Sequence, residues 1–330
     1  MSRVDKFGRQ RKRGTLPKYS HQLPGHAHLE RILLAATLSL MVTSCSLKKM
    51  AVSEVAGIVE DGVQAYEWDD ELELVERSLP ANIKLLEAML VSDPSNTRLM
   101  VLLSRLYGSY AYGFSDARYE SYRPQGPSDH TKDELLARIN TYYQRGIHFA
   151  TQAIKFVKPV CEEELKSAET VATCFDRLSK DDVGAMFWLG FNMAAYINRN
   201  LGSLKALSQA YVIEKAMNRV VKLDEHYFHG GAHLLLIAFY GGRPKMAGGD
   251  FEKAEEHYQK LKQIAGDGYL LGDVMYARYL LVQKQDKAGF HTLLTKVVAA
   301  RDDAADSRLY SQIARIRART YLSQEEDLFE

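Results

Sequence analysis

The residues with the most definite chemistry surround Cys45. An apolar run, residues 32–41, leads into Val42-Thr43-Ser44-Cys45, and a basic stretch at residues 9–13 lies upstream. The run has the length of a secretory signal core, about 7–15 residues, and is too short for a bilayer span of about 20. Small side chains before the cysteine allow an extended backbone to enter a peptidase cleft, after which the thiol carries the lipid. This order predicts a bacterial lipoprotein signal at 1–44 with lipid attachment at Cys45; the alternative is a buried amphipathic helix that ends in Cys.

Two further cysteines, Cys161 and Cys174, lie 13 positions apart. Export would place them where disulfides persist. One unbroken helix would separate their Cα atoms by about 20 Å, whereas a disulfide needs these atoms about 4.4–6.8 Å apart. A bridge therefore requires residues 162–173 to fold back as a hairpin or loop, and the alternative is two buried free thiols.

Catalytic chemistry finds little support in the sequence. His229 and His233 have the i, i+4 spacing that can bind zinc from one helix face. Gly230 stands where a zinc hydrolase would carry its general-base Glu, and no third ligand is indicated. The sequence shows no nucleophile elbow, phosphate-binding loop or dinucleotide-binding glycine motif. We expect no enzyme activity, no metal and no cofactor; a hydrolase that binds metal through His229 and His233 is the weaker alternative.

Aromatic residues crowd two stretches of the chain, which has 19 Tyr. Aromatic rings bury large apolar areas, and Tyr hydroxyls at a rim can orient a ligand. One interpretation is core packing with hydroxyls at the surface. The other is an apolar cavity or groove between helix pairs, for which the candidate residues are Tyr107, Tyr110, Phe187, Trp188, Phe191 and Tyr196.

The charge distribution bears on the kind of partner. The whole chain has 43 Lys and Arg and 42 Asp and Glu, of which residues 1–44 hold eight and two, so the remainder carries a net charge of −5. A mildly acidic body with no basic stripe argues against nucleic acid as a partner. Apart from residues 32–41, no apolar run approaches the length of a membrane span, so membrane attachment would depend on the lipid.

The elements that must position these residues are helices. From Leu79 onward apolar residues recur at helical spacing, and almost no segment alternates as a strand would. Pro94 cannot continue a helix, and Ser95 or Asn96 can cap the next one. The expected helices cover residues 80–90, 99–110, 132–156, 182–198, 204–223, 229–240, 250–264, 269–282, 286–300 and 304–322, with a loop at 121–131.

The helices come in pairs separated by short turns. Residues 249–258 have the spacing of the second helix of a tetratricopeptide repeat, in which a small residue, here Ala254, lets two helices approach and an aromatic residue, here Tyr258, fills the gap. The period is irregular, so we expect three or four degenerate repeats and a C-terminal capping helix. The predicted fold class is all-α, an antiparallel helix-hairpin superhelical stack. Its predicted parts are a leader and signal peptide at 1–44, a lipid-anchored tether with one short helix at 45–78 and a tetratricopeptide-like domain at 79–330.

A series of short motifs runs through the second half of the chain. They are Gly230-Gly231-Ala232-His233, Gly248-Gly249-Asp250-Phe251-Glu252-Lys253-Ala254, Tyr276-Ala277-Arg278-Tyr279 and Phe290-His291-Thr292-Leu293-Leu294, with Phe187-Trp188-Leu189-Gly190 upstream. Behind the export signal, this order resembles the T component of lipoprotein-linked TRAP transporters (the TatT family) over about residues 79–329. Thr320-Tyr321 and the insert from Cys161 to Cys174 depart from the family pattern.

The resemblance implies a periplasmic lipoprotein built from tetratricopeptide-like hairpins. It also implies assembly as a homotrimer, contact with the periplasmic solute-binding P component of a TRAP system, and a hydrophobic small molecule as ligand. The location would be the periplasmic side of the inner or outer membrane of a Gram-negative bacterium; Ser46 is compatible with outer-membrane sorting. The alternative is a cell-envelope scaffold lipoprotein with helical repeats and no transport role, since repeat stacks present extended concave faces.

Overall fold

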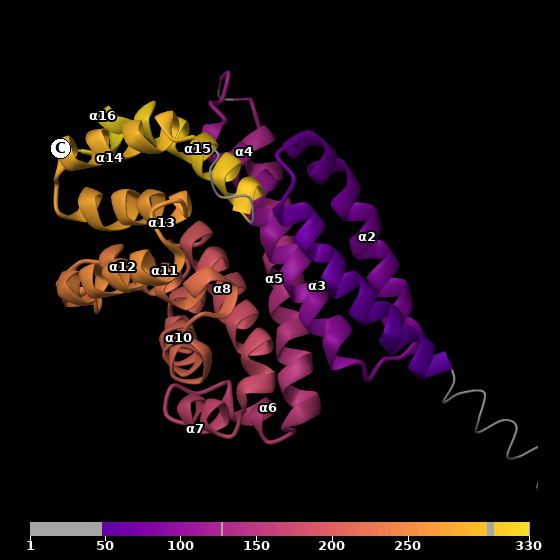
Figure 1. Ribbon diagram of the computed structural model, residues 1–330. Helices are drawn as coiled ribbons and strands as arrows, with labels where there is room; N and C mark the ends of the chain where they lie inside the picture. Colours follow the sequence, from indigo (N-terminus) through magenta and orange to yellow (C-terminus); the bar gives the residue numbers. More distant parts are fainter. Residues whose placement is uncertain (1–47, 127, 302–306, 330) are drawn as a thin grey trace, which may run out of the picture. The chain divides into compact units, whose positions relative to one another are not determined.

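The computed structural model describes residues 48–126, 128–301 and 307–329, and every regular element in these ranges is helical (Figure 1). A helix at residues 48–67 comes first. The elements after it are α2 (Leu72–Ser92), α3 (Thr97–Tyr110), the π-helical segment η1 (Ala111–Asp116), α4 (Ala117–Ser121), α5 (Thr131–Val157), α6 (Cys161–Glu164), α7 (Val171–Asp176), the 3-10 turn η2 (Lys180–Asp182), α8 (Val183–Arg199), α9 (Leu204–Leu207), α10 (Ala210–Asp224), α11 (Tyr227–Gly241), the 3-10 turn η3 (Lys245–Ala247), α12 (Phe251–Ala265), α13 (Leu270–Met275), the π-helical segment η4 (Tyr276–Leu281), α14 (Lys287–Ala299), α15 (Arg308–Leu322) and α16 (Glu325–Leu328).

The expectation of an all-α fold is therefore confirmed. Among the described residues, no helix combines the length and the apolar character that a bilayer crossing would require. The predicted signal at 1–44 and the lipidated Cys45 lie outside the described ranges.

The first described residues form packed helices where the sequence suggested mainly a tether. In the helix at 48–67, Ala56 and Val63 lie two turns apart on the same face, and both are buried against the core. From the apolar pattern we expected a helix at residues 80–90, with Pro80 as its first residue. Instead α2 begins at Leu72 and tolerates Pro80 inside it at the loss of one backbone hydrogen bond. The helical body thus extends to the N-terminal side of the predicted boundary at residue 79.

Side-chain caps set the starts of several helices. The Oδ1 atom of Asn96 accepts a hydrogen bond from the backbone N–H of Leu99 at 3.0 Å, at the start of α3. At the start of α12, Asp250 Oδ1 accepts from the N–H of Lys253 at 3.1 Å. These bonds satisfy backbone donors that the first turn of a helix leaves free. The Asn96 cap agrees with the sequence, which offered Ser95 or Asn96 for this role, and the Asp250 cap is a finding of the structure.

A polar contact joins α3, α5 and α8 in the core. Asn192 Nδ2 donates to the carbonyl of Trp188 at 2.7 Å and to that of Ser104 at 3.2 Å, and Ser104 Oγ donates to the carbonyl of Gly146 at 2.8 Å. A Cβ atom at Gly146 would lie 2.3 Å from Asn192 Oδ1, so a larger residue would push α5 away from α8. This junction holds the middle of the molecule at a fixed spacing.

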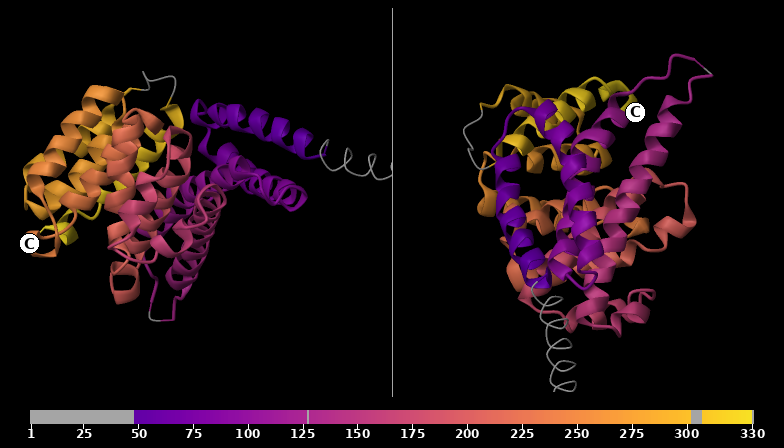
Figure 2. Two further views of the ribbon diagram at one scale, coloured as in Figure 1. Left: turned by 90° about the horizontal axis from the view of Figure 1, so that it is seen from below. Right: turned by 90° about the vertical axis from the view of Figure 1, so that its right-hand side faces the viewer.

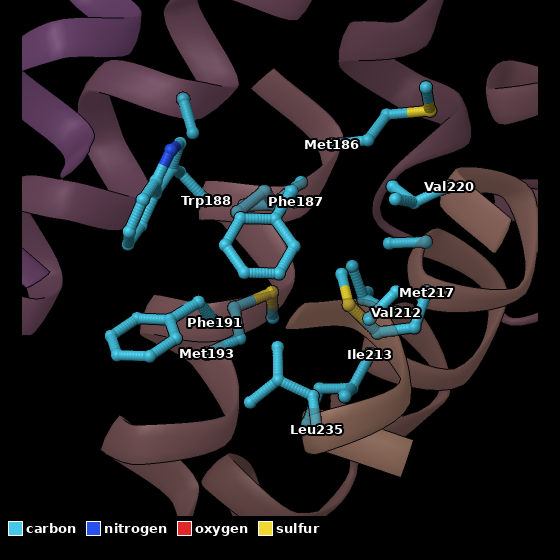
Figure 3. Close-up of a cluster of buried hydrophobic side chains, with 14 of the residues drawn as sticks. Met186, Phe187, Trp188, Phe191, Met193, Val212, Ile213, Met217, Val220 and Leu235 are labelled. Carbon is cyan, nitrogen blue, oxygen red and sulfur yellow. The ribbon is translucent and has the colours of Figure 1, made fainter. Parts of the chain in front are cut away.

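The apolar core around α8 has two sides. In Figure 3, Trp188 and Phe191 lie on one side of the cluster, and Met217 of α10 lies on the other, with Phe187 between them. A Cβ atom at Gly190 would come within 2.5 Å of the Met217 Cε atom, so this glycine lets α10 approach α8. The side with Trp188 and Phe191 faces the cavity described below.

Neighbouring helices in the chain pack on one another. Helix α3 packs on α5, α5 on α8, α8 on α10, α10 on α11 and α11 on α12. In the left view of Figure 2, helices from the N-terminal part (indigo to magenta) and from the C-terminal part (orange to yellow) lie on opposite sides of the unit at residues 49–330. Helix α15 joins the two sides, since it lies beside α4 (Figure 1). Pairwise packing of this kind is expected of a repeat stack, and the tetratricopeptide-like superhelix stays a prediction.

The insert between α5 and α8 folds back on itself. Helices α6 and α7 pack together, and a disulfide joins Cys161 to Cys174 with their Cα atoms 5.1 Å apart. Arg219 of α10 attaches this insert to the body, because its Nε donates to the carbonyl of Phe175 at 3.0 Å and its Nη2 to that of Leu178 at 2.8 Å.

Candidate functional site

A cavity of about 200 Å³ lies within the unit at residues 49–330, and most of the side chains that line it are apolar. It exceeds the roughly 150 Å³ of a dry apolar cavity that holds benzene. The aromatic rings in its wall belong to Tyr66, Tyr112, Phe114, Trp188, Phe191, Phe228, Phe239, Tyr269, Tyr279 and Tyr310. Leu201 and Leu207 also line it and are 61% and 38% exposed, so the cavity reaches the molecular surface.

Two of the six aromatic residues singled out from the sequence, Trp188 and Phe191, line this cavity. They lie three residues apart on α8, so they share one face of that helix, and their ring centroids are 5.2 Å apart. The Trp188 ring is 1% exposed and belongs to the innermost part of the wall.

The other four candidates lie elsewhere. Phe187 is buried beside Trp188 but is not among the lining residues, and Tyr110 packs edge-on against Tyr142. Tyr196 accepts a hydrogen bond from Gln144 on the surface of the bundle. The Tyr107 hydroxyl donates to Glu87 at 2.6 Å and accepts from Arg145 at 2.7 Å; burial and Glu87 raise its pKa to about 12. For these residues the packing interpretation describes the structure better than the cavity interpretation.

The two π-helical segments supply lining residues that sequence reasoning missed. Tyr112 and Phe114 come from η1, and Tyr279 comes from η4. A π turn inserts one residue into a helix, so the i, i+3 and i, i+4 pattern no longer tells which side chain faces inward. The Tyr112 hydroxyl donates to Met275 Sδ at 3.6 Å, which links η1 to the last residue of α13, directly before η4. The crowding of aromatic residues near η1 was the sole signal in the sequence.

A left-handed stretch of backbone places Phe228 in the wall. Phe228 has φ 52° and ψ 55°, and His229 and Gly230 follow with φ 56° and 75°. Bulky non-glycine residues rarely adopt this conformation, which costs about 1–3 kcal/mol per residue and tends to occur at functional sites. The Phe228 ring packs on Trp188 with centroids 4.9 Å apart and on Tyr310 at 5.5 Å.

An open groove on the outer surface lies next to the cavity. Phe228, Glu67 and Arg105 line both, so these three side chains form the partition between them. Arg105 forms an ion pair with Glu67, and the Tyr310 hydroxyl donates to Glu67 Oε1 at 2.7 Å. The partition is therefore an aromatic ring beside a hydrogen-bonded ion pair.

A second group of charges in the wall forms a closed network. Arg317 of α15 is 2% exposed; its Nη1 donates to Glu120 of α4 at 2.7 Å, and its Nη2 donates to the carbonyl of Tyr112 at 2.6 Å. Arg199 of α8 pairs with both Asp116 and Glu120. Burial alone would raise the pKa of Glu120, but the positive charges of Arg317 and Arg199 outweigh burial and lower it. Two arginines and two carboxylates make the network neutral.

Arg243, just after α11, differs from the other charged residues of the wall. Six charged residues line the cavity, and five of them form ion pairs, either with one another or with Glu120. For Arg243 the described residues provide no ion-pair partner. Its Nε donates to the carbonyl of Phe239 at 2.9 Å, and its guanidinium carbon lies 3.5 Å from the centroid of the Phe239 ring.

The histidines considered as zinc ligands do not converge. His229 stacks on Tyr269 with ring centroids 5.4 Å apart, whereas the Nδ1 of His233 lies 2.9 Å from the Nδ1 of His257. Burial and the neighbouring His233 lower the pKa of His257 to about 4. The pair therefore shares a hydrogen bond between neutral rings at neutral pH, and this arrangement gives no support to the hydrolase alternative.

Comparison with known proteins relates this chain to a protein of similar length and to a family. A protein of Treponema pallidum (strain Nichols), described as uncharacterized, is 24% identical over 322 residues, which cover 92% of this chain and 99% of that protein. Residues 68–329 match the family described as "TRAP transporter T-component". That family is one of transport accessory proteins, and the match spans nearly the whole helical body. The chain belongs to the TRAP transporter T-component family.

Proposed function

We propose that this protein is a lipid-anchored periplasmic accessory protein that binds a hydrophobic small molecule in its cavity and contacts the solute-binding P component of a TRAP transporter. Family membership supports the accessory role in transport. The proposal of a hydrophobic ligand rests on the cavity of about 200 Å³, with its aromatic wall and its exposed leucines at the surface. Pockets with mostly apolar walls and a few placed polar groups are typical ligand sites.

The cavity also helps to distinguish a ligand-binding protein from the alternative, an envelope scaffold. An envelope scaffold requires only that its helices pack, so its aromatic side chains are expected to be packed in the core without a cavity. Here Trp188 and Phe191 lie at the edge of the packed cluster and form part of the cavity wall. Two π-helical segments contribute further aromatic rings to the same wall. Strained backbone at Phe228 adds a further ring. These features favour a binding protein.

Filling the cavity tests the ligand. Ala238 lines it, so Ala238→Phe should reduce binding of an apolar fluorophore such as N-phenyl-1-naphthylamine at least about tenfold, because the new ring occupies the ligand volume. Ala299→Phe, on an exposed position of α14, is the matched control and should bind as the wild type does. Fluorophore binding that is equal in both variants would refute a ligand site in this cavity.

Co-purification tests the partner. The full chain, tagged at its C-terminus and expressed in its own bacterium, should enrich a TRAP solute-binding protein after cross-linking of intact cells. A Cys45→Ser variant should lack the lipid and be released from membranes, since acyl chains contribute about 0.8 kcal/mol for each buried CH₂ group. The size of the complex by mass photometry would show whether it is the homotrimer that the family resemblance implies. Repeated failure to enrich any solute-binding protein would argue against the P-component contact.

A further inference from the structure

The polar atoms in the cavity wall define what kind of apolar molecule fits it. Fully buried donors are normally hydrogen-bonded, and an unpaired one costs about 1–3 kcal/mol. Four donor atoms of residues that line the cavity are buried without a hydrogen-bond partner: Trp188 Nε1, Arg243 Nη2, Tyr269 Oη and Arg317 Nε. Each of these atoms can donate a hydrogen bond. The wall therefore offers donors and is short of acceptors, which suits a ligand with an oxygen acceptor.

Charge separates Arg243 from the other three donors. The charge of Arg317 is matched by Glu120 and Asp116, and Tyr269 and Trp188 are neutral, so none of the three calls for an anion. Arg243 has no carboxylate partner among the described residues; Glu214 acts on it only from farther away. Burial lowers the pKa of Arg243 below its ordinary value because the cation has lost water without gaining an ion pair.

The Arg243 guanidinium is also held in place. The Phe239 ring supports one of its faces, with 3.5 Å between the guanidinium carbon and the ring centroid, and Nε is occupied by the Phe239 carbonyl. Both contacts come from Phe239 of α11, four residues back, and neither of them engages Nη2. A planar guanidinium with its orientation set in advance matches a carboxylate, which can accept two parallel hydrogen bonds.

We infer that the ligand is an amphiphile with a single carboxylate, whose apolar chain occupies the cavity and whose carboxylate forms an ion pair with Arg243. This inference rests on the proposed ligand-binding function and narrows its substrate class. One unmatched positive charge in an apolar wall accommodates one negative charge. A dianionic headgroup would leave its second charge buried and unpaired. An uncharged chain would leave Arg243 Nη2 without an acceptor.

Trp188 supplies a direct readout. The chain has two tryptophans, and a Trp68→Phe background leaves Trp188, which lines the cavity and is 1% exposed. Quenching of its fluorescence by a bromine atom therefore reports on a molecule inside the cavity. The full chain in lipid nanodiscs is titrated with 12-bromododecanoic acid and with 12-bromododecan-1-ol, which share the chain and differ in the headgroup; a second quencher-free acid corrects for partition into lipid.

We expect the acid to bind at least about tenfold more tightly than the alcohol, because a hydrogen-bonded ion pair replaces an unpaired donor. Arg243→Gln should bring the affinity for the acid down to that for the alcohol and leave the alcohol unchanged. Arg278→Gln removes an equal charge from a residue outside the cavity wall and should keep the preference for the acid.

The outcomes separate the two levels of the argument. If acid and alcohol bind equally to the wild type, or if Arg243→Gln retains the preference, the carboxylate assignment is wrong while the apolar cavity stands. If neither compound quenches Trp188, the proposed ligand-binding function itself fails. The comparison of acid with alcohol in the wild type needs no variant, and unchanged binding of the alcohol by Arg243→Gln shows that this variant is folded.

Discussion

Arg317 and Arg243 line the same cavity, but their surroundings are opposite. Arg317 lies in a neutral network in which Glu120, Asp116 and the Tyr112 carbonyl share its charge. Arg243 has an aromatic ring and one backbone carbonyl, and the described residues offer it no carboxylate. Both carry a buried donor without a hydrogen-bond partner. A buried, unpaired donor is therefore common to the two residues, although Arg317 as a whole is buried and Arg243 is partly exposed, and the balance of charge distinguishes them.

This difference distinguishes an arginine that stabilises the fold from an arginine that is available to bind an anionic ligand. A buried cation whose charge is matched within the chain joins helices that are distant in sequence, here α15, α4 and α8. Its removal leaves carboxylates buried and uncompensated. A cation whose charge is unmatched contributes little to folding, and its electrostatic free energy remains for an anion from outside.

The largest expected effect is on stability. Arg317→Met should lower the free energy of unfolding by about 3–5 kcal/mol, because Arg199 would then be the one cation left to compensate the two buried carboxylates, Glu120 and Asp116. Arg243→Met, the matched substitution in the same cavity, should cost only about 1 kcal/mol, the scale of its contact with the Phe239 ring. Urea unfolding of the full chain measures both. Equal losses in the two variants would remove the distinction between these arginines.

A double variant sharpens the same point. Arg317→Met together with Glu120→Met removes one charge of each sign and leaves Arg199 paired with Asp116. The double variant should therefore be more stable than the sum of the two single losses predicts, by about 1–3 kcal/mol. A double-mutant cycle in urea gives this coupling free energy. Additive losses would mean that the two side chains stabilise the fold independently.

Local patterns made much of the fold predictable. Apolar residues at helical spacing predicted nearly all of the longer helices, and Asn96 was one of the two residues expected to cap α3. Both signals act within a few residues, so they can be read from one sequence. Pro80 shows the limit, since it lies inside α2, where packing of the surrounding apolar residues outweighs its local preference.

Much of the candidate site could not be predicted, because its contacts are not local. Trp188 and Phe191 were singled out because aromatic residues crowd their stretch of the chain, but Arg317 and Glu120 meet across 197 positions, and no local pattern relates them. The left-handed conformation of Phe228 contradicts its own preference, and the π turn at Tyr112 changes which face points inward. The binding character of Arg243 depends on a partner that is missing, which only the assembled wall reveals.

Acid should also separate the two arginines. The pKa of Glu120 is lowered in the folded protein, so its ionised form contributes stability at neutral pH, and this contribution is lost as pH falls below the ordinary value of 4.5. We expect the free energy of unfolding to fall as pH decreases from 5 to 3. Arg317→Met should reduce this loss, because the main cation that favours the ionised carboxylate is gone. Arg243→Met should keep the wild-type profile; a change in its profile would place Arg243 in the network.

The histidine pair must be separated from this measurement. His257 has a pKa of about 4 in the folded protein and an ordinary value of 6.5 when unfolded, so the unfolded state binds the proton first. Stability therefore falls as pH decreases from about 6.5 to about 4 and is unaffected by this group above that window. A His257→Gln background should remove most of this slope, and His130→Gln, an exposed histidine, should leave it unchanged. An unchanged slope in His257→Gln would mean that other groups cause the pH dependence.

The smallest expected effect concerns the ring beneath Arg243. Phe239→Leu removes the aromatic face that supports the guanidinium, a contact worth about 0.5–1 kcal/mol, so 12-bromododecanoic acid should bind about two- to fivefold more weakly relative to the alcohol. Phe191→Leu removes a ring of the same size from the same cavity wall, away from any lone cation, and should weaken acid and alcohol by the same factor. The ratio of the two affinities, read from quenching of Trp188, cancels the loss of apolar contact that both variants share. If the ratio falls equally in both variants, the preference for the acid comes from the shape of the cavity, and Arg243 is no different from the other cations around it.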